Sequence, residues 1–323
     1  MKTILILALD GVMDSSLAIT LDTLHAGQAF VANAGKPARI RTVVAGHRKT
    51  VRTGNGLLLK PEVTFAEALV RTPRPEWILV PALGMATEEA IDTRLRQKDA
   101  LAAMALLREA SSSVHIGASC SSVFLLAETG LLDGRQATMT WWLAHLFRAR
   151  HPAVRLDEAK MLVRDGAYLT SGSAYSQLDL MLAVVADTMG TTIAHLCSRY
   201  LLIDQRPSQA RYMIHAHRPH VDPTVVAAEL WIDAHLAEPI SITDLAAELS
   251  VSPKTLARRI DAATGVPPLK FIQRRRLLHA SHLIETTSLS IDAIAAKVGY
   301  QDGTALRKLV KREFGKTPAA LRG

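Results

Sequence analysis

The chain has 323 residues, of which 49% are apolar and 21% charged; this suffices for two domains with buried cores and excludes a disordered chain. Its two cysteines, Cys120 and Cys197, exclude a disulfide framework, and no apolar run reaches the roughly 18–20 residues of a membrane helix. We therefore expect a cytoplasmic protein with no membrane partner. Its net charge of +8 is typical of a protein that binds a polyanion, but also of a basic surface that only keeps the protein soluble. Sequence motifs are needed to distinguish the two.

The first 190 residues alternate strand and helix patterns. The opening segment, MKTILILALDG, has an apolar stretch of only about seven residues that Asp10 ends, without a cleavage site, so it predicts a buried first strand rather than a signal peptide. This alternation predicts an α/β domain over residues 1–190 with a mostly parallel sheet. Strands are expected at 3–9, 39–46, 77–84 and 113–120, and helices at 16–35, 100–111, 121–132 and 176–190.

Residues 191–221 have the pattern of a helical linker that ends in a turn-rich segment. His215, His217 and His220 have a spacing that suits a metal ion, but they lack cysteine or carboxylate partners, so no metal site is predicted. Strand patterns then stop, which predicts an all-α domain over residues 222–323.

The excess positive charge is concentrated in this second domain. Residues 250–323 hold 14 Lys and Arg against 5 Asp and Glu, whereas the other 249 residues hold 24 against 25. Residues 241–265 predict two short helices with Ser241 and Ser252 as N-caps. The second helix has a polar, basic start, as a recognition helix presents to the major groove of DNA. Its predicted DNA-contacting residues are Pro253, Lys254, Thr255, Arg258 and Arg259.

The same pattern returns at residues 290–315, where the apolar positions match those of the first helix pair one by one. The matched positions are Leu245 and Ile294, Ala246 and Ala295, Ala247 and Ala296, Leu249 and Val298, Leu256 and Leu306, and Ile260 and Val310. On the exposed side of the second recognition helix we expect DNA contacts from Thr304, Arg307, Lys308 and Lys311. Residues 268–287 suit a spacer helix, so the two units could read successive major-groove segments roughly 34 Å apart.

Residues 222–322 resemble the AraC/XylS-type DNA-binding domain. The resemblance rests on the A-x-x-V-G-Y-x-D segment that starts at Ala295 and on two G-x-x-P endings. The chain departs from the family at Leu306 and Val310, where aromatic residues are usual, and at Lys308, where arginine is usual; lysine weakens a bidentate base contact. The resemblance implies a transcription regulator with a double-stranded DNA operator and RNA polymerase as partners. It also implies that the first recognition helix reads bases more consistently than the second.

Cys120 ends the strand expected at 113–120 and opens the next helix, which is the geometry of a nucleophile elbow. A helix N-terminus lowers the pKa of a thiol and offers backbone N–H groups to an anion. The surrounding sequence resembles the DJ-1/PfpI, class I glutamine-amidotransferase-like domain, loosely over 1–190, which implies a flavodoxin-like sheet. With the AraC-type module, the chain resembles the GlxA-like subfamily of regulators. That resemblance implies a homodimer whose first domain binds a small effector, often a nitrogen-containing metabolite such as an amino acid or a quaternary amine.

The alternative function is an enzyme, a cysteine hydrolase or hydratase of the PfpI type. Related domains carry a histidine in an A-T-x-H-W segment, but Thr140 takes that position here, and a threonine does not accept the thiol proton usefully at neutral pH. We therefore predict no catalytic residue and no cofactor, and interpret Cys120 as part of a ligand pocket, with redox sensing and residual catalysis as alternatives. The predicted ligand-binding residues are Asp14, Cys120, Ser121, Thr140, Trp141, Ser171 and Ser173.

Two further interpretations stay open. Trp141 and Trp142 could line a cage for a cationic ligand by cation–π contact, or pack in a core or a dimer. An RNA-binding or general nucleoid protein is a third functional class, but the basic faces lack the interleaved aromatic residues that are typical of RNA recognition.

Overall fold

The structure is a computed structural model that describes residues 2–35, 40–71, 75–110, 114–204, 206, 208–213 and 222–322. The chain divides into two compact units, Met1–Arg206 and Pro207–Gly323. His215, His217 and His220 lie outside the described residues. Within the described ranges, no helix is long and apolar enough to cross a membrane.

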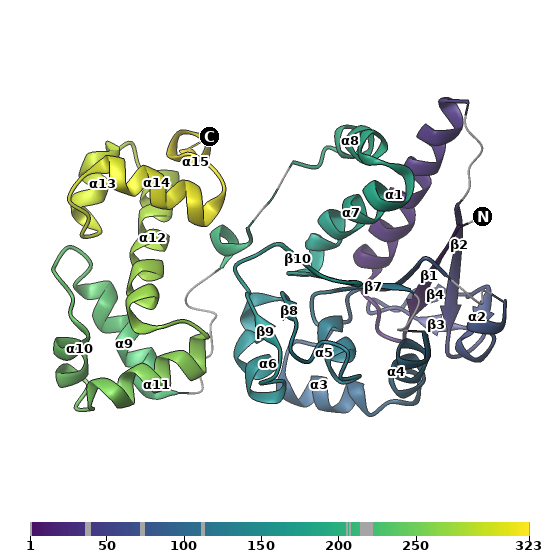
Figure 1. Ribbon diagram of the computed structural model, residues 1–323, viewed down its shortest axis with the longest axis horizontal. Coiled ribbons are helices and arrows are strands. Elements are labelled where there is room, and N and C mark those ends of the chain that lie inside the picture. Colours follow the sequence, from purple (N-terminus) through teal and green to yellow (C-terminus); the bar gives the residue numbers. More distant parts are fainter. Residues whose placement is uncertain are drawn as a thin grey trace. The chain divides into compact units, whose positions relative to one another are not determined.

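The first unit is built on a seven-stranded sheet with the strand order β10-β11-β7-β6-β1-β2-β5 (Figure 1). All neighbouring strands are parallel except β10 and β11. The predicted α/β domain with a mostly parallel sheet is confirmed, and the unbroken apolar sequence of β6 and of β1 from Ile4 onward reflects burial from both faces. The strands are β1 (Lys2–Ala8), β2 (Ile40–Gly46), β5 (Val63–Thr64), β6 (Trp77–Val80), β7 (His115–Ser119), β10 (Leu162–Asp165) and β11 (Tyr168–Ser171).

Helices cover both faces of this sheet. On one face α1 (Asp14–Asn33), α7 (Gln177–Met189) and α8 (Thr191–Tyr200) contact one another, and Figure 1 shows them above the strands. Helices α1 and α7 cross closely at Gly27, where a Cβ atom would lie 2.6 Å from the sulfur of Met189. On the other face α4 contacts α2, α3 and α5. The remaining helices are α2 (Phe65–Arg71), α3 (Glu88–Leu95), α4 (Lys98–Ala110), α5 (Ser122–Ala127) and α6 (Ala144–Arg150).

Some elements of the first unit differ from the sequence predictions. The strand expected at 77–84 ends at Val80, because the next residues leave the sheet to bond with neighbouring loops; Ala82 O accepts a hydrogen bond from Met13 N. The helix expected at 121–132 ends at Ala127. Elements of two or three residues were not predicted because they are too short for a periodic pattern. These are β5, given above, and β3 (Val51–Arg52), β4 (Leu58–Leu59), β8 (Gln136–Ala137), β9 (Arg155–Leu156), η1 (Trp141–Leu143) and η2 (Ala174–Ser176).

The first unit continues past residue 190. Helix α8, which the sequence analysis assigned to the linker over 191–221, packs against α1 and α7. Beyond it, Arg206 Nη2 donates to Tyr175 O at 2.9 Å and forms an ion pair with Asp179 at 2.5 Å. These contacts hold the segment up to Arg206 on the α/β unit, because they satisfy a largely buried carboxylate that would otherwise be unpaired.

The described residues of the second unit form only helices, which confirms the predicted all-α class. Asp222, Ser241 and Ser252 accept hydrogen bonds from backbone N–H groups two or three residues on, at 2.8, 3.0 and 3.1 Å, as N-caps do. The helices are η3 (Ala210–Tyr212), α9 (Pro223–Ala234), α10 (Ile242–Glu248), α11 (Pro253–Thr264), α12 (Pro268–Thr286), α13 (Ile291–Lys297), α14 (Gly303–Phe314) and α15 (Pro318–Arg322).

The two helix pairs α10–α11 and α13–α14 share one packing scheme. Most of the matched apolar positions are buried: Leu245, Ala246, Leu256 and Ile260 in the first pair, and Ile294, Ala295, Val298, Leu306 and Val310 in the second. Ala247 and Ala296, which also match in the repeat, both face outward, and Leu249 is half-buried. The sequence repeat therefore corresponds to two helix-turn-helix units.

Candidate nucleic-acid interface and ligand site

Helix α11 is the first candidate recognition helix. Leu256 and Ile260 are fully buried, and helical geometry places Lys254 and Arg258 on the opposite side, where both are exposed. Pro253 at the first helical position is also exposed. Thr255 is half-buried, and its hydroxyl lies 2.9 Å from the hydroxyl of the cap Ser252.

Arg259 differs from its neighbours on α11. Its Nη1 donates a hydrogen bond to the hydroxyl of Thr224, and its Nε lies 3.6 Å from the carboxylate of Asp222. Both partners belong to the start of α9, so Arg259 ties the candidate recognition helix to the helix at the beginning of the unit. Lys254 and Arg258, in contrast, present their charges to the solvent.

Helix α14 is the second candidate recognition helix. The Asp302 side chain caps it by accepting from Ala305 N at 2.8 Å, and Asp292 accepts from Gly303 N at 2.9 Å. Four predicted contact residues are exposed on this helix: Thr304, Arg307, Lys308 and Lys311. Arg307 lies 4.0 Å from the Asp292 carboxylate, an exposed and weak ion pair. Arg312, one turn after Lys308, is exposed as well; its i+4 spacing was the signal that the sequence analysis overlooked.

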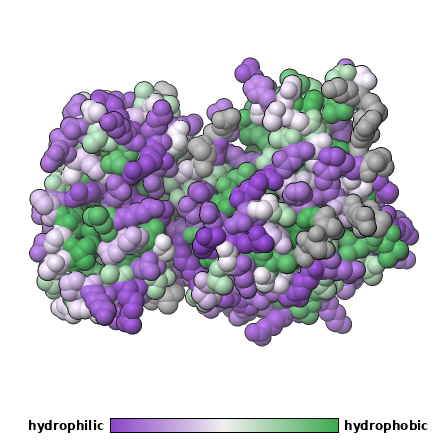
Figure 2. Space-filling model, in the orientation of Figure 1, coloured by the Kyte–Doolittle hydropathy of each residue, from purple (hydrophilic) through white to green (hydrophobic). Residues whose placement is uncertain are grey.

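The two candidate recognition helices are equivalent in their packing. Arg258 and Lys308 each follow the buried leucine, Leu256 or Leu306, by two residues and are both exposed. Figure 1 places α11 and α14 near opposite ends of α12, and α12 contacts both. On the face that Figure 2 shows, the second unit is mainly hydrophilic with smaller apolar patches. This arrangement displays two basic helices on one shared helix, α12.

In the first unit, Cys120 lies in a sharp turn between β7 and α5. Its φ angle is +55°, a left-handed value that a side chain other than glycine rarely adopts. Its backbone N–H donates to Ser171 O at 3.1 Å, which links this turn to the end of β11. The predicted elbow is therefore present, and the thiol is buried, with 4% of the residue exposed.

Burial raises the pKa of the Cys120 thiol, although hydrogen bonds with Ser121 and Thr140 act in the opposite direction. The Thr140 hydroxyl lies 3.4 Å from the hydroxyl of Ser173, at the start of η2. The structure thus brings Cys120, Ser121, Thr140, Ser171 and Ser173 together at the carboxyl edge of the sheet. Such an edge is where open α/β sheets bind ligands.

Two other predicted ligand residues lie differently. Trp141 follows Thr140 in η1 and packs edge-on against Trp142, with ring centroids 5.4 Å apart. Asp14 is bonded to the loop after β3 instead: Thr53 Oγ1 donates to it at 2.6 Å and Asn55 Nδ2 at 2.9 Å. The hydrogen bond from Thr53 is the main reason that the pKa of Asp14 is lowered. Asp14 is thus held as an ionised anchor for that loop.

Comparison with known proteins identifies the first unit. Residues 2–187 match the model of the DJ-1/PfpI family. The chain belongs to the DJ-1/PfpI family. Residues 245–323 of this DJ-1/PfpI protein also match a helix-turn-helix domain model.

Two relatives of this DJ-1/PfpI protein are HTH-type transcriptional regulators. It is 30% identical over 225 residues to the HTH-type transcriptional regulator GlxA of Rhizobium meliloti, which covers 67% of this chain and 68% of GlxA. It is 27% identical over 218 residues to the HTH-type transcriptional regulator ArgR of Pseudomonas aeruginosa, covering 67% and 66%. A crystal structure of a Vibrio parahaemolyticus protein described as a transcriptional regulator superimposes with a TM-score of 0.52 at 22% identity, over 62% of this chain and 98% of that one. That superposition supports the fold of the first unit.

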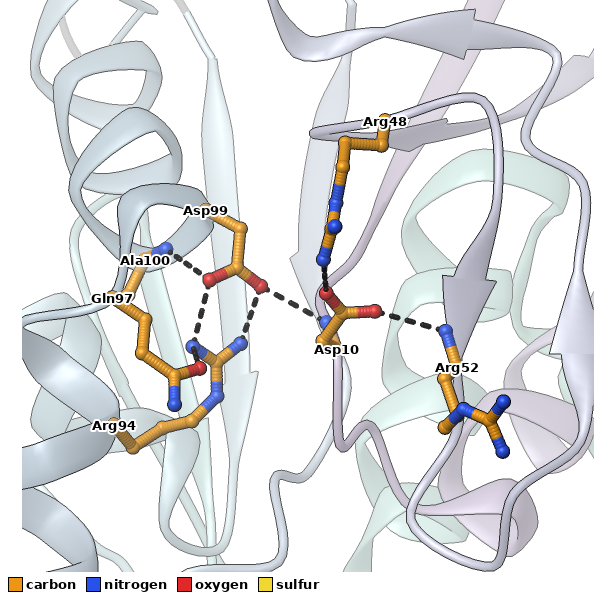
Figure 3. A network of polar contacts seen from close by, with 7 residues as sticks. All are labelled: Asp10, Arg48, Arg52, Arg94, Gln97, Asp99 and Ala100. Atoms are coloured by element: carbon orange, nitrogen blue, oxygen red, sulfur yellow. Dashed lines mark hydrogen bonds and ion pairs between the residues drawn. The ribbon is translucent and has the colours of Figure 1, made fainter.

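A second polar network lies at the carboxyl end of β1 in this DJ-1/PfpI unit (Figure 3). Asp99, at the start of α4, is buried and binds Arg94 through both oxygens, at 2.6 and 2.8 Å. It also accepts the backbone N–H of Asp10 at 3.0 Å, and Asp10 in turn holds Arg48 and the backbone N–H of Arg52. The network joins the loops after β1 and β2 to α4. Local sequence patterns do not reveal it, because Asp10 lies 89 residues from Asp99 in the chain.

Within the part of the chain that the structure describes, no group of three or more His, Cys, Asp or Glu side chains is arranged to hold a metal ion. The polar groups around Cys120 are hydroxyls and backbone amides, which suit hydrogen bonding to an organic ligand better than coordination of a transition metal.

Proposed function

We propose that this DJ-1/PfpI regulator binds specific double-stranded DNA sites through α11 and α14, and that a small metabolite bound in its first unit changes this binding. One observation carries the DNA part: two helix-turn-helix units bury the same apolar positions and expose Arg258 and Lys308 at the same place. A single basic helix is common on protein surfaces. A repeated one, held on a shared support, suits two successive segments of the major groove.

The test of DNA binding uses the full chain and sites selected from random duplexes. Replacing Lys254 or Arg258 by alanine should weaken binding to the selected site by about 1–3 kcal/mol and relax base preference at one position. Lys60→Ala, which removes an exposed charge from the first unit, is the matched control and should leave site preference unchanged. If wild type and both α11 variants have the same base preference, α11 is not the helix that reads bases.

The effector part of the proposal rests on the groups around Cys120. Ser119 and Ser171 are paired across β7 and β11, and both hydroxyls are buried without a hydrogen-bond partner among the described residues. A buried hydroxyl without a partner costs about 1–3 kcal/mol, so a molecule that bonds to it stabilises the folded state. The nearby Thr140 and Ser173 come from the segments around η1 and η2, which a bound molecule would have to move or order. A nitrogen-containing metabolite is the class we propose: the N–H groups of an amino acid or a polyamine can donate to such hydroxyls, and the carboxylate of a betaine can accept from them.

A thermal-shift screen with amino acids, betaines and polyamines tests this proposal, since a ligand that binds only the native state raises the melting temperature. A hit should lose its shift in Thr140→Val, which keeps the volume but removes the hydroxyl. The Thr140→Val substitution leaves the ion pair between Arg148 and Glu158, which is not part of this group, unchanged. A shift that survives Thr140→Val would place the effector elsewhere.

We also propose that the regulator acts as a homodimer and that ligand-dependent placement of its DNA-binding units alters either DNA affinity or contact with RNA polymerase. A dimer supplies two copies of α11 and α14, and so a longer site than one chain can cover. Sedimentation at micromolar concentration tests whether the protein is a dimer. Transcription in vitro with purified RNA polymerase tests whether the regulator contacts the polymerase.

The competing enzymatic function is disfavoured by the state of the thiol. The elbow at Cys120 is the specific observation in its favour. A cysteine nucleophile acts as the thiolate, however, and burial raises the pKa of Cys120, with Thr140 rather than a histidine beside it. Hydrolysis of any ester or amide substrate that Cys120→Ser abolishes, with DNA binding unaffected, would restore the enzymatic function.

A further inference from the structure

Three consecutive arginines on α12, Arg274, Arg275 and Arg276, contribute to the positive charge of the second unit, yet all three point to groups of the protein itself. Successive residues on a helix are about 100° apart, so three in a row point in three directions. Each direction meets a different partner. This arrangement makes the middle of α12 a junction between the two helix-turn-helix units.

The first two arginines each anchor α12 to one neighbour. Arg274 Nε lies 3.4 Å from the Glu313 carboxylate on α14. Arg275 is 5% exposed and donates to Asp233 at 3.0 Å and to Glu229 at 3.3 Å, both on α9. Buried pairs of this kind fix the relative placement of helices even where their net contribution to stability is small.

Arg276 bonds to the loop before the first helix-turn-helix unit, α10–α11, and to the turn within the second, α13–α14. Its Nη2 donates to Glu238 O at 2.6 Å, in the loop between α9 and α10. Its Nη1 donates to Gly299 O at 3.1 Å, in the turn between α13 and α14. The planar guanidinium holds its donors in a fixed fork, so it sets the position of one carbonyl relative to the other.

The backbones of the two helix-turn-helix units also meet at this point. Gly299 has φ +75°, and a Cβ atom on it would lie 2.3 Å from Leu236 O and 2.7 Å from Arg276 Cζ. The turn that precedes α14 is therefore pressed against the loop that precedes α10, with Arg276 bonded to both sides of the contact.

We propose that Arg276 is a positioning residue for DNA recognition: it sets the separation and rotation of α11 and α14, and thereby the spacing between the two DNA segments that the protein reads. The inference rests on the proposed DNA-binding function. Without Arg276, α12 stays bonded to α14 through Arg274 and to α9 through Arg275, but the Gly299 turn can shift against the α9–α10 loop. One base pair of DNA moves the second segment by about 3.4 Å and rotates it by about 34°, so a small shift changes which spacing fits.

The experiment measures binding of the full chain to its selected site and to the same site with one base pair inserted or removed between the segments. Wild type should prefer the selected spacing by about tenfold or more, as for a mismatch in a specific site. Arg276→Ala should reduce that preference to under about threefold while base preference within each segment is kept. Lys270→Ala is the matched control: it removes an exposed charge from the same helix and should keep the wild-type preference.

Arg276→Lys separates positioning from a contact with DNA phosphate. Lysine keeps the charge but has no rigid fork, so we expect it to lose spacing preference as alanine does. Two outcomes overturn the proposal. One is that both variants keep the wild-type spacing preference. The other is that Arg276→Ala loses affinity equally at every spacing and Arg276→Lys recovers that affinity. If wild type binds no selected site above random DNA, the proposed function fails, and the inference with it.

A second measurement needs no DNA and serves if Arg276→Ala folds poorly. Spin labels on cysteines introduced at the exposed positions Asp261 of α11 and Arg312 of α14 report the distance between the two helices. The distance distribution should be narrow in an otherwise wild-type chain and broader in Arg276→Lys. An unchanged distribution contradicts the positioning role.

Discussion

At the scale of single residues, side chains of the same type have different tasks on the candidate recognition helices. Arg258 and Arg259 are adjacent in sequence, and the sequence analysis treated both as DNA contacts. The structure leaves Arg258 exposed and bonds Arg259 to Thr224 and Asp222. A residue one step along a helix points about 100° away, so adjacent arginines rarely share a partner.

This difference predicts opposite effects of two alanine substitutions. Arg259→Ala should lower the stability of the second unit by about 0.5–1 kcal/mol, as expected for a partly exposed ion pair with a hydrogen bond, and leave base preference unchanged. Arg258→Ala should leave stability within about 0.5 kcal/mol of wild type and reduce base preference. Urea denaturation and binding to single-base variants of the site measure the two effects. The reverse pattern would show that Arg259 leaves α9 to reach the DNA.

The buried thiol of Cys120 predicts a pH dependence. Burial raises its pKa above the ordinary value of 9.0, so the folded state keeps a proton that the unfolded chain begins to release. Stability from this group is therefore present below pH 9.0 and is lost as pH rises above it. Urea midpoints measured from about pH 8 to about pH 10 should fall more steeply for wild type than for Cys120→Ser, whose hydroxyl does not titrate there. Identical profiles would mean that the thiol ionises as easily in the folded state.

At the scale of elements, turns decide how the helix-turn-helix units meet. The turn at Gly299 combines a left-handed backbone with a contact that has no space for a side chain. In contrast, Gly134 has a similar φ of +71° but nothing within 4 Å of an added Cβ atom. Substitutions at Gly299 and Gly134 therefore separate the stability cost of a side chain on a left-handed backbone from the cost of its steric clash with a neighbouring loop.

We predict that Gly299→Ala destabilises the second unit by more than the 1–3 kcal/mol or so that a strained backbone alone costs, whereas Gly134→Ala costs the first unit only about that amount. Hydrogen exchange, which reports on the two units separately, measures both effects. Similar losses in the two variants would show that the α9–α10 loop moves aside at little cost.

At the scale of the whole molecule, most of the excess charge is in the second unit, but part of it is bonded internally. Arg259, Arg274, Arg275, Arg276 and Arg322 have partners within that unit. DNA affinity therefore depends on fewer charges than the sequence total indicates. The exposed basic residues of α11 and α14 are the ones available to displace counterions from DNA.

The salt dependence of DNA binding should reflect this smaller number. Log affinity should fall linearly with log salt concentration, and Lys311→Ala should reduce the slope by about 0.9, the value for one phosphate contact. Arg275→Ala should leave the slope unchanged if the unit stays folded, because Arg275 is buried against Glu229 and Asp233. Fluorescence anisotropy over a salt series measures both slopes. A slope change on removal of Arg275 would contradict its internal role.

The amino-acid sequence by itself determined the α/β class of the first unit, the all-α class of the second, their helix caps and the repeat of buried positions. These properties follow from local periodicity and from residues such as Ser252 and Asp222 that act on their own helix. The sequence also indicated the elbow at Cys120, because a strand followed by small residues and a helix is a local signal.

Only the tertiary structure decided which polar side chains face solvent and which face a partner far along the chain. It bonded Asp14 to Thr53, tied Arg259 to α9, and directed Arg276 to carbonyls 38 and 23 residues away. Sequence periodicity separates buried from exposed helix faces, but an arginine is long enough to reach a partner from either. Its direction depends on what the fold brings near, which no local pattern contains.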